Sequence, residues 1–306
     1  MSTVLKVENL SHRYSTAWAI RDISFEISQT GVIGLLGSNG AGKSTTMNII
    51  CGVLKQTEGE VYINGINKKD DPRLAKRQLG FLPQTPPLYA DFTVNEYLTY
   101  AADLRFIEKT AVKKAVAEAM DKTGIAHFSS RLIKNLSGGY RQRVGIAQAI
   151  IHKPSVVILD EPTNGLDPNQ IIEARKLIRE IGNEHIVLLS SHVLSEINLL
   201  CRDIIMIEGG RIVFSDSMDS FNNYLQPSSV LAVMENMPAE AELLKLRGVT
   251  KVEFLSGRQC RIYFAGADNI TELVIAASMQ HQWRLQEINL ERSLLDDVFK
   301  QLSRQS

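Results

Sequence analysis

Hydrophobic and polar residues alternate in the first part of the chain. Residues 20–28 (IRDISFEIS) alternate as expected of a half-exposed antiparallel strand, and residues 4–14 (VLKVENLSHRY) are also predicted to form a strand. Residues 31–36 (GVIGLL) are apolar without interruption, which is typical of a strand buried on both faces. We expect a helix directly after it, over residues 43–54, and another strand over residues 60–64.

Strand-like and helix-like segments alternate again after residue 155. Strands are predicted at 156–160, 186–190, 203–209 and 211–215, with helices near 168–182 and 193–200. This alternation predicts a mostly parallel sheet with helices on both faces. Residues 85–150 interrupt it with helical patterns alone, including a run over 93–124 that Thr93 can cap and Gly124 can end. We therefore predict a helical subdomain over about residues 85–150.

The pattern changes after about residue 222. Residues 221–229 (FNNYLQPSS) are polar and contain a proline, which is typical of a linker. The following segments predict strand, helix, strand, strand, helix, strand and a last amphipathic helix, at 229–235, 239–246, 251–256, 261–266, 270–280, 283–289 and 294–302. The order β-α-β-β-α-β is that of the ferredoxin-like arrangement. The sequence thus predicts two domains, 1–222 and 223–306, and the second is a small α+β domain.

Composition narrows the class of protein. The chain has 306 residues, of which 34 are basic and 34 acidic, so no net charge favours a nucleic-acid partner. No run of about 18 apolar residues occurs, and the start, MSTVLKVENL, lacks the apolar core of a secretion signal. The cysteines, Cys51, Cys201 and Cys260, are widely spaced and suit buried positions in a reducing compartment. We expect a cytoplasmic protein that spans no membrane.

A phosphate-binding loop is predicted between the apolar strand and the helix that follows it. GSNGAGKS (37–44) fits the pattern G-x-x-x-x-G-K-[ST] in the context that this pattern requires. Its glycines can take positive φ and leave no Cβ in the way of phosphate oxygens. Lys43 is expected to reach the β- and γ-phosphates, and Ser44 to hold Mg²⁺. The expected nucleotide contacts are Gly37, Ser38, Asn39, Gly40, Ala41, Gly42, Lys43, Ser44 and Thr45.

Two acids follow a second apolar strand, in VVILDEP (156–162). Asp160 at the end of the strand is placed to bind the Mg²⁺ shell. Glu161 points elsewhere and can polarise a water molecule against the γ-phosphate. The simpler alternative is that both acids cap the next helix, but their occurrence together with the phosphate loop argues against it. These features predict an NTPase of the P-loop class.

A second glycine-bearing turn begins the segment NLSGGYRQRVGIAQAI (135–150). Ser137 and two glycines precede a helix, an arrangement that suits an anion at a helix N-terminus. LSGGYRQR resembles the signature of ATP-binding cassette (ABC) ATPases. Further family motifs occur in the family's order: Tyr14, then Gln84 in FLPQTPPL, the loop NGLDP, and His192 in LSSHVLSE. The resemblance covers roughly residues 4–220.

This resemblance implies a fold, a cofactor and a partner. The fold would be a P-loop cassette with a mixed α/β sheet, an antiparallel β subdomain and a helical subdomain. Two copies would face head to tail and bury two ATP molecules with Mg²⁺ between them. Each copy's Ser137, Gly138 and Gly139 would contact the γ-phosphate held by the other copy, and Asp167 would link the two sites. The complete set of catalytic residues favours two identical copies.

The resemblance also implies roles for single residues. Tyr14 would stack on adenine, His192 would contact the γ-phosphate, and Gln84 would sense Mg²⁺ or the attacking water. Alternatives stay open for several side chains: Tyr14 can be an ordinary strand-edge aromatic, and Trp18 is expected in the core. Arg141 and Arg143 either form a solvated basic face or support the signature turn. Packing or surface positions are expected for His12, His127, His152, His185 and His281.

The chain resembles in particular the ATPase subunits of bacterial ABC-2-type exporters, such as gliding-motility, copper-maturation and multidrug systems. This implies polytopic permease subunits, which would dock near Gln84 and residues 85–105 and hold the chain at the cytoplasmic face of the membrane. Those residues can equally form subdomain core. The alternative is a soluble ABC ATPase that remodels nucleic acid or ribosomes; an importer ATPase is disfavoured by the C-terminal pattern. That domain's role is open between dimer support, regulation, partner contact and plain stability.

Overall fold

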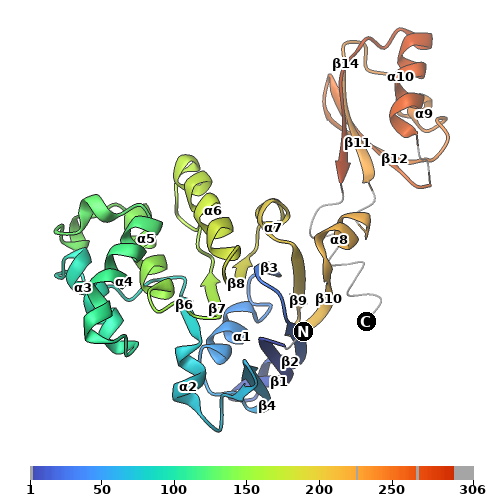
Figure 1. Ribbon diagram of the computed structural model, residues 1–306. Helices are drawn as coiled ribbons and strands as arrows, with labels where there is room; N and C mark the ends of the chain where they lie inside the picture. Colours follow the sequence, from blue (N-terminus) through green and yellow to red (C-terminus); the bar gives the residue numbers. More distant parts are fainter. Residues whose placement is uncertain (1–2, 225–226, 267–268, 293–306) are drawn as a thin grey trace. The chain divides into compact units, whose positions relative to one another are not determined.

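The computed structural model describes residues 3–224, 227–266 and 269–292 (Figure 1). They belong to two compact units, Met1–Met218 and Asp219–Ser306. The boundary predicted between residues 222 and 223 falls inside α8 (Met218–Tyr224), so the second unit begins earlier than predicted. Within the described residues no helix has the length and apolar character needed to span a bilayer.

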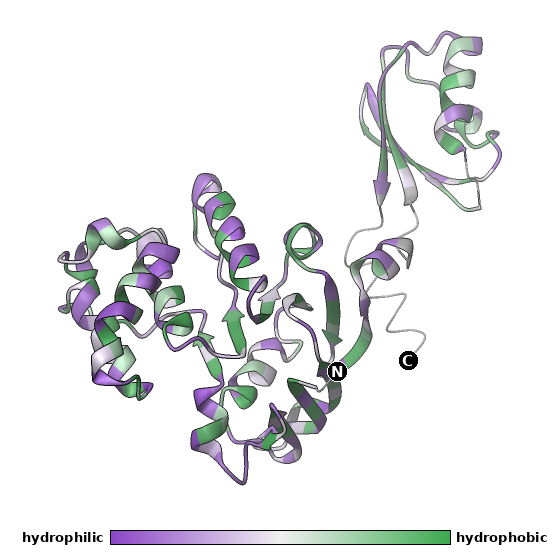
Figure 2. Cartoon of the chain, in the orientation of Figure 1, coloured by the Kyte–Doolittle hydropathy of each residue, from purple (hydrophilic) through white to green (hydrophobic). Residues whose placement is uncertain are grey.

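A six-stranded sheet forms the centre of the first unit, in the order β10-β9-β3-β8-β7-β6. Its strands are β3 (Gly31–Leu36), β6 (Leu79–Leu82), β7 (Val156–Asp160), β8 (Ile186–Ser191), β9 (Asp203–Glu208) and β10 (Arg211–Ser217). Neighbours are parallel, except that β10 pairs antiparallel with β9. β7 and β8 are buried along their whole length, and Figure 2 shows the hydrophobic colour along β7. The predicted mixed sheet is confirmed.

A four-stranded antiparallel sheet, in the order β2-β1-β4-β5, packs against this core. Its strands are β1 (Leu5–Tyr14), β2 (Ala17–Ile27), β4 (Glu58–Ile63) and β5 (Ile66–Asn67). The helix α1 (Lys43–Ile50) contacts both β2 and β7. Its Met47, Ile49 and Ile50 are buried with residues of both sheets, so one hydrophobic core joins the two sheets beneath the phosphate loop.

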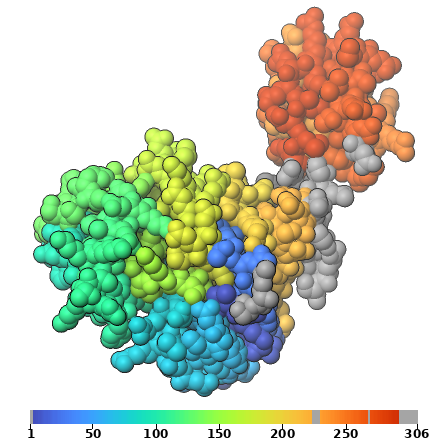
Figure 3. Space-filling view, in the orientation of Figure 1, coloured from blue at the N-terminus to red at the C-terminus, as the bar shows by residue number. Residues whose placement is uncertain are grey.

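The helical subdomain has a separate core and forms the green lobe of Figure 3. It contains α3 (Val94–Leu104), α4 (Lys109–Lys122), α5 (Gly138–Ile150) and the 3₁₀ turns η1 (Ala126–Phe128) and η2 (Ile133–Asn135). Thr93 caps α3 through a capping box with Glu96, as its position predicts. The helical run predicted over 93–124 is interrupted, because the chain turns at Phe106 with φ of 58°. The short α2 (Pro72–Arg77) was not predicted, nor was β6.

Two helices cover β3 closely, α6 (Pro168–Gly182) and α7 (Leu194–Leu200). A Cβ at Gly182 would lie 2.8 Å from Val32 Cγ2, and one at Gly34 would lie 2.7 Å from Ile197 Cγ2. Each helix therefore reaches the sheet at a glycine. Since α6 follows β7 and α7 follows β8, both helices begin at the carboxyl edge of the sheet, close to the loops predicted to carry the chemistry.

The second unit has the predicted β-α-β-β-α-β order. After α8 come β11 (Pro227–Met234), α9 (Glu240–Leu243), β12 (Val249–Ser256), β13 (Gln259–Phe264), α10 (Ile270–His281) and β14 (Leu285–Arg292). The strand order is β12-β13-β11-β14, with all neighbours antiparallel. Val230, Val274 and Trp283 lie in its core.

Two predictions for this region need correction. Residues 221–229 were predicted to form a polar linker, but those that the structure describes belong to α8 and β11, and Phe221 is fully buried. The helix predicted over 239–246 is only the single turn of α9. The amphipathic helix predicted over 294–302 lies outside the described residues.

Candidate nucleotide site

The glycine-bearing loop 37–42 joins β3 to α1, as its sequence predicts. Two of its glycines are in places where a side chain would collide with backbone or core. A Cβ at Gly37 would lie 2.3 Å from Ile207 O, and one at Gly42 (φ +109°) would lie 2.4 Å from Ile20 Cγ2. Gly40 also has positive φ, but open space surrounds it. A phosphate could approach the backbone at this point without meeting a side chain.

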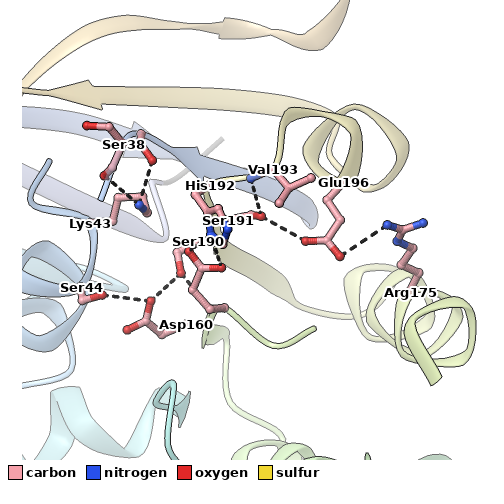
Figure 4. A network of polar contacts seen from close by, with 12 residues as sticks. Ser38, Lys43, Ser44, Asp160, Arg175, Ser190, Ser191, His192, Val193 and Glu196 are labelled. Carbon is pink, nitrogen blue, oxygen red and sulfur yellow. Dashed lines mark hydrogen bonds and ion pairs between the residues drawn. The ribbon is translucent and has the colours of Figure 1, made fainter. Parts of the chain in front are cut away.

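Lys43 lies over this loop. Its side chain is buried, and Nζ donates to Gly37 O at 2.8 Å and to Ser38 O at 3.1 Å (Figure 4). Burial lowers the pKa of Lys43, while the nearby carboxylates of Glu161, Asp160 and Glu208 oppose this shift. The ammonium group is thus held at the loop by backbone carbonyls, in reach of an anion bound to the loop amides.

Asp160 connects the phosphate loop to two neighbouring strands. Its Oδ1 accepts from Ser44 Oγ at 3.2 Å and from Ser190 Oγ at 2.5 Å, because β7 and β8 pair in parallel with Asp160 opposite Ser190. The Ser190 hydroxyl in turn accepts from the backbone N–H of Glu161 at 2.9 Å. A hydroxyl and a carboxylate are hard oxygen donors of the kind that Mg²⁺ prefers, so Ser44 and Asp160 fit the metal of a magnesium nucleotide.

Glu161 and His192 are in contact. His192 Nδ1 lies 3.0 Å from both carboxylate oxygens of Glu161. Glu161 is 8% exposed and has a φ of 50°, which is uncommon outside glycine and is found where a site constrains the backbone. The sequence predicted both residues for the site from separate motifs. It did not predict that the histidine would meet the carboxylate.

The turn at Ser137–Gly139 and the turn at Asp167 lie beside each other. Ser137 and Gly138 are exposed at the start of α5, whereas Gly139 is buried under Gln170 of α6, where a Cβ would lie 2.6 Å from Gln170 Cδ. Asp167 is exposed and caps α6, accepting from the backbone N–H of Gln170 at 2.9 Å. The exposed backbone amides at the start of α5 form a second site where the chain can bind an anion.

Comparison with known proteins decides the family. The family model described as ABC transporter matches residues 20–164. The bacitracin transport ATP-binding protein BcrA of Bacillus licheniformis is 36% identical over 70% of this chain and 69% of its own length. The chain belongs to the ABC transporter family of ATP-binding proteins.

Two further relatives of this ABC protein extend the comparison. The linearmycin resistance ATP-binding protein LnrL of Bacillus subtilis is 30% identical over 96% of this chain and 97% of its own length, so that match includes the second unit. The solved dimeric post-hydrolysis structure of the ATP-binding cassette MJ0796, bound to ADP and Pi, is 25% identical with a TM-score of 0.63. The match covers 70% of this chain and 98% of the MJ0796 chain.

Tyr14 and Gln84, which were also predicted for the ABC site, are both exposed to solvent. Tyr14 is 51% exposed at the end of β1, with its ring packed edge-on against His12 at 4.7 Å. Gln84 is exposed after β6, and within the described residues no hydrogen bond joins it to Asp160. Trp18 is not in the core as expected: it is 38% exposed, and Arg21 lies 4.9 Å from its ring centroid.

Arg141 and Arg143 lie on α5, the signature helix, and they differ in their contacts. Arg143 forms an ion pair with Glu173 of α6 and donates through Nη1 to Thr123 O at 3.0 Å. Arg141 is exposed. Gln142, between them, donates to Pro162 O at 2.9 Å and so ties the signature helix to the segment directly after Glu161. Gln142 and Arg143 therefore support the turn at Ser137–Gly139, whereas Arg141 does not.

Several histidines are packing residues, as expected. His152 Nε2 lies 3.0 Å from Leu79 O of β6, and His185 Nδ1 lies 2.6 Å from Pro154 O in the loop before β7. Burial lowers the pKa of His152 to about 4, so this ring is neutral near pH 7. All three cysteines are buried with free thiols.

Sequence reasoning missed Glu208, the last residue of β9. Its carboxylate accepts from Ser38 Oγ at 2.9 Å and from the Ser38 backbone N–H at 3.4 Å, directly behind the loop that holds Lys43. The adjoining turn adds a second connection, since Gly210 N donates to Ala41 O at 3.1 Å. No motif marks Glu208; only the parallel pairing of β3 with β9 could have placed it near the loop.

Proposed function

We propose that this ABC protein binds ATP with Mg²⁺, hydrolyses ATP, and works as a pair of identical copies that powers an ABC-2-type export complex. The observation that carries the proposal is the contact between Glu161 and His192 next to Asp160 and the phosphate loop. A buried carboxylate, oriented by a histidine and placed one residue from a metal-binding aspartate, is what the activation of a water molecule needs.

Each residue of the site has a separate role in the proposed hydrolysis. Lys43 exchanges its carbonyl partners for the β- and γ-phosphates, and the loop amides hold the same phosphates. Mg²⁺ bound at Ser44 and Asp160 would neutralise charge on the phosphate oxygens. Glu161 accepts a proton from the water that attacks the γ-phosphorus, and the bond to the bridging oxygen of ADP breaks. His192 keeps that carboxylate oriented, in addition to its expected contact with the γ-phosphate.

The second copy completes the site in this proposal. The turn at Ser137 and Gly138 is exposed and offers backbone amides at a helix start, so it can close over ATP held by another copy. Asp167 lies beside that turn at the start of α6. The dimeric structure of the MJ0796 cassette supports this arrangement. Loss of the γ-phosphate removes the contact that joins the copies, and the pair then opens.

A groove beside the helical subdomain supports a permease partner. It has a volume of about 840 Å³, and its walls carry cations and aromatic rings, among them Arg73, Lys76, Arg77, Arg105, Tyr89, Tyr100 and Phe106. The part of the lining that the structure describes contains no acid. Part of the predicted docking segment, residues 85–105, forms one wall. A cytoplasmic permease segment with apolar and acidic side chains would fit this groove, and it would hold the chain at the cytoplasmic face of the membrane.

The relatives favour an exporter over the alternative, an ABC ATPase that remodels nucleic acid or ribosomes. The name of BcrA refers to bacitracin transport and that of LnrL to linearmycin resistance, and the LnrL match includes the second unit. The equal numbers of basic and acidic residues give no support to a nucleic-acid partner.

The transport part of the proposal is tested by capture of the partner. Tagged Glu161→Gln protein, expressed in its own host and loaded with ATP, is recovered from detergent-solubilised membranes and its companions are identified by mass spectrometry. We expect a stoichiometric polytopic membrane protein. Charge reversal in the groove, Arg73→Glu with Arg77→Glu, should reduce its recovery, whereas Lys113→Glu on the exposed side of α4 should not. Ribosomal or DNA-repair proteins without a membrane partner would exclude the export function.

A further inference from the structure

Glu196 is a buried carboxylate that the proposed hydrolysis does not use. It lies in the first turn of α7, shortly after His192, and is 6% exposed. Burial of a carboxylate is unfavourable unless charged and hydrogen-bonded partners compensate for the lost hydration. The partners of Glu196 therefore indicate what this acid does.

Those partners come from two elements. Glu196 Oε2 accepts from Ser191 Oγ at 3.0 Å, and Oε1 lies 3.5 Å from Nη2 of Arg175 on α6 (Figure 4). The Ser191 hydroxyl oxygen also accepts from the backbone N–H of Val193 at 3.0 Å. One carboxylate thus fixes, through one hydroxyl, the backbone on both sides of His192.

The His192 ring needs this support. Its side chain is 46% exposed, so close packing does not restrict it as it would a core residue. Its ring meets Glu161 through Nδ1, and both side chains depend on the backbone at the end of β8 being held in place. Arg175 ties this segment to α6, the helix that begins at Asp167.

We propose that Glu196, held by Arg175, is a positioning residue for His192. It fixes the path of the Ser191–Val193 backbone, so that the imidazole meets the Glu161 carboxylate. It acts through His192 and does not touch the nucleotide. The inference rests on the proposed ATPase function, in which Glu161 acts on the attacking water, and it adds the residues that keep this pair aligned.

The test uses two variants of the full chain that alter different parts of the network. Glu196→Gln keeps the shape and one carbonyl acceptor but removes the charge that faces Arg175. Ser191→Ala keeps the ion pair and removes both bonds to the His192 segment. We expect each to lower kcat about tenfold, as loss of an orienting partner outside the reacting groups does. The Kd for a non-hydrolysable ATP analogue should stay within about twofold of wild type, since Lys43 and the loop amides that bind the phosphates are unchanged in both variants.

Arg179→Met is the matched control. Arg179 lies one turn further along α6, and its Nη2 donates to Leu199 O at 2.7 Å, at the far end of α7 from His192. Its loss should leave kcat unchanged. A normal kcat in Ser191→Ala would overturn the proposal whatever Glu196→Gln does, and so would an equal loss in all three variants. An inactive wild-type chain would instead remove the proposed function, and with it this inference.

Discussion

Gly42→Ala should destabilise the first unit more than Gly40→Ala, although both lie in the phosphate loop and both have positive φ. The values are +84° at Gly40 and +109° at Gly42, so an alanine is strained at either position. Only at Gly42 would an added Cβ also collide with neighbouring atoms. A Cβ there would lie 2.4 Å from Ile20 Cγ2 and 2.9 Å from Ala19 O, whereas at Gly40 it would meet no atom within 4 Å.

The two effects differ enough to be separated. Backbone strain of a non-glycine residue at positive φ costs about 1–2 kcal/mol, and this term is common to both variants. A methyl group forced into a filled space costs about 1–3 kcal/mol more. We therefore expect Gly42→Ala to be less stable than Gly40→Ala by about 2 kcal/mol. For a unit of this size that difference lowers Tm by about 4–8 °C.

The assay is urea unfolding of the nucleotide-free chain followed by tryptophan fluorescence. The chain has two tryptophans, and Trp283→Phe leaves only Trp18, which lies on β2 of the first unit close to Ile20. Both glycine variants are made in this background, so the signal comes from the unit that contains the loop. Equal losses of stability in the two variants would show that contact with β2 does not restrict Gly42.

Three further predictions concern other parts of the first unit. Glu208→Gln should raise the affinity for ATP by roughly threefold, because it removes a negative charge bound to Ser38; titration with a fluorescent ATP analogue measures this, with Glu60→Gln as control. Burial lowers the pKa of Lys68 to about 8 from an ordinary value of 10.5, so the unfolded chain binds more protons between these values. Stability should therefore rise by about 3 kcal/mol from pH 8 to pH 10.5 in urea unfolding, a rise that Lys68→Met should abolish. Asp167→Ala should lower Tm by about 2–4 °C through loss of the α6 cap, while Asp167→Asn, which keeps the acceptor, should retain the wild-type Tm in calorimetry.

Local sequence signals predicted the elements that frame the site. The run VVILD coincides with β7, and Pro168–Gly182 coincides with the helix predicted after it. In both cases the pattern is strong: an unbroken apolar strand, and a helix with an aspartate cap and a proline in its first turn. The strand β6 escaped prediction because four residues are too short to show a period.

Contacts between distant segments were not predictable in the same way. The Glu208 carboxylate reaches Ser38 across a sequence separation of 170 residues, and Glu196 needs Arg175 from another helix. Motif spacing identified Glu161 and His192 one at a time, but their contact depends on the parallel pairing of β7 with β8. A sequence shows which groups a chain carries, whereas the sheet order decides which of them meet.

The proposed closure of two copies over ATP determines the mass of Glu161→Gln protein in solution, which light scattering during gel filtration measures with and without ATP and Mg²⁺. We expect a monomer without nucleotide and, with ATP, a stable dimer of twice the 34.1 kDa chain that does not hydrolyse its ATP. Hydrolysis at the wild-type rate would show that Glu161 does not act on the water. A chain that binds ATP and stays a monomer would contradict closure of two copies over the nucleotide.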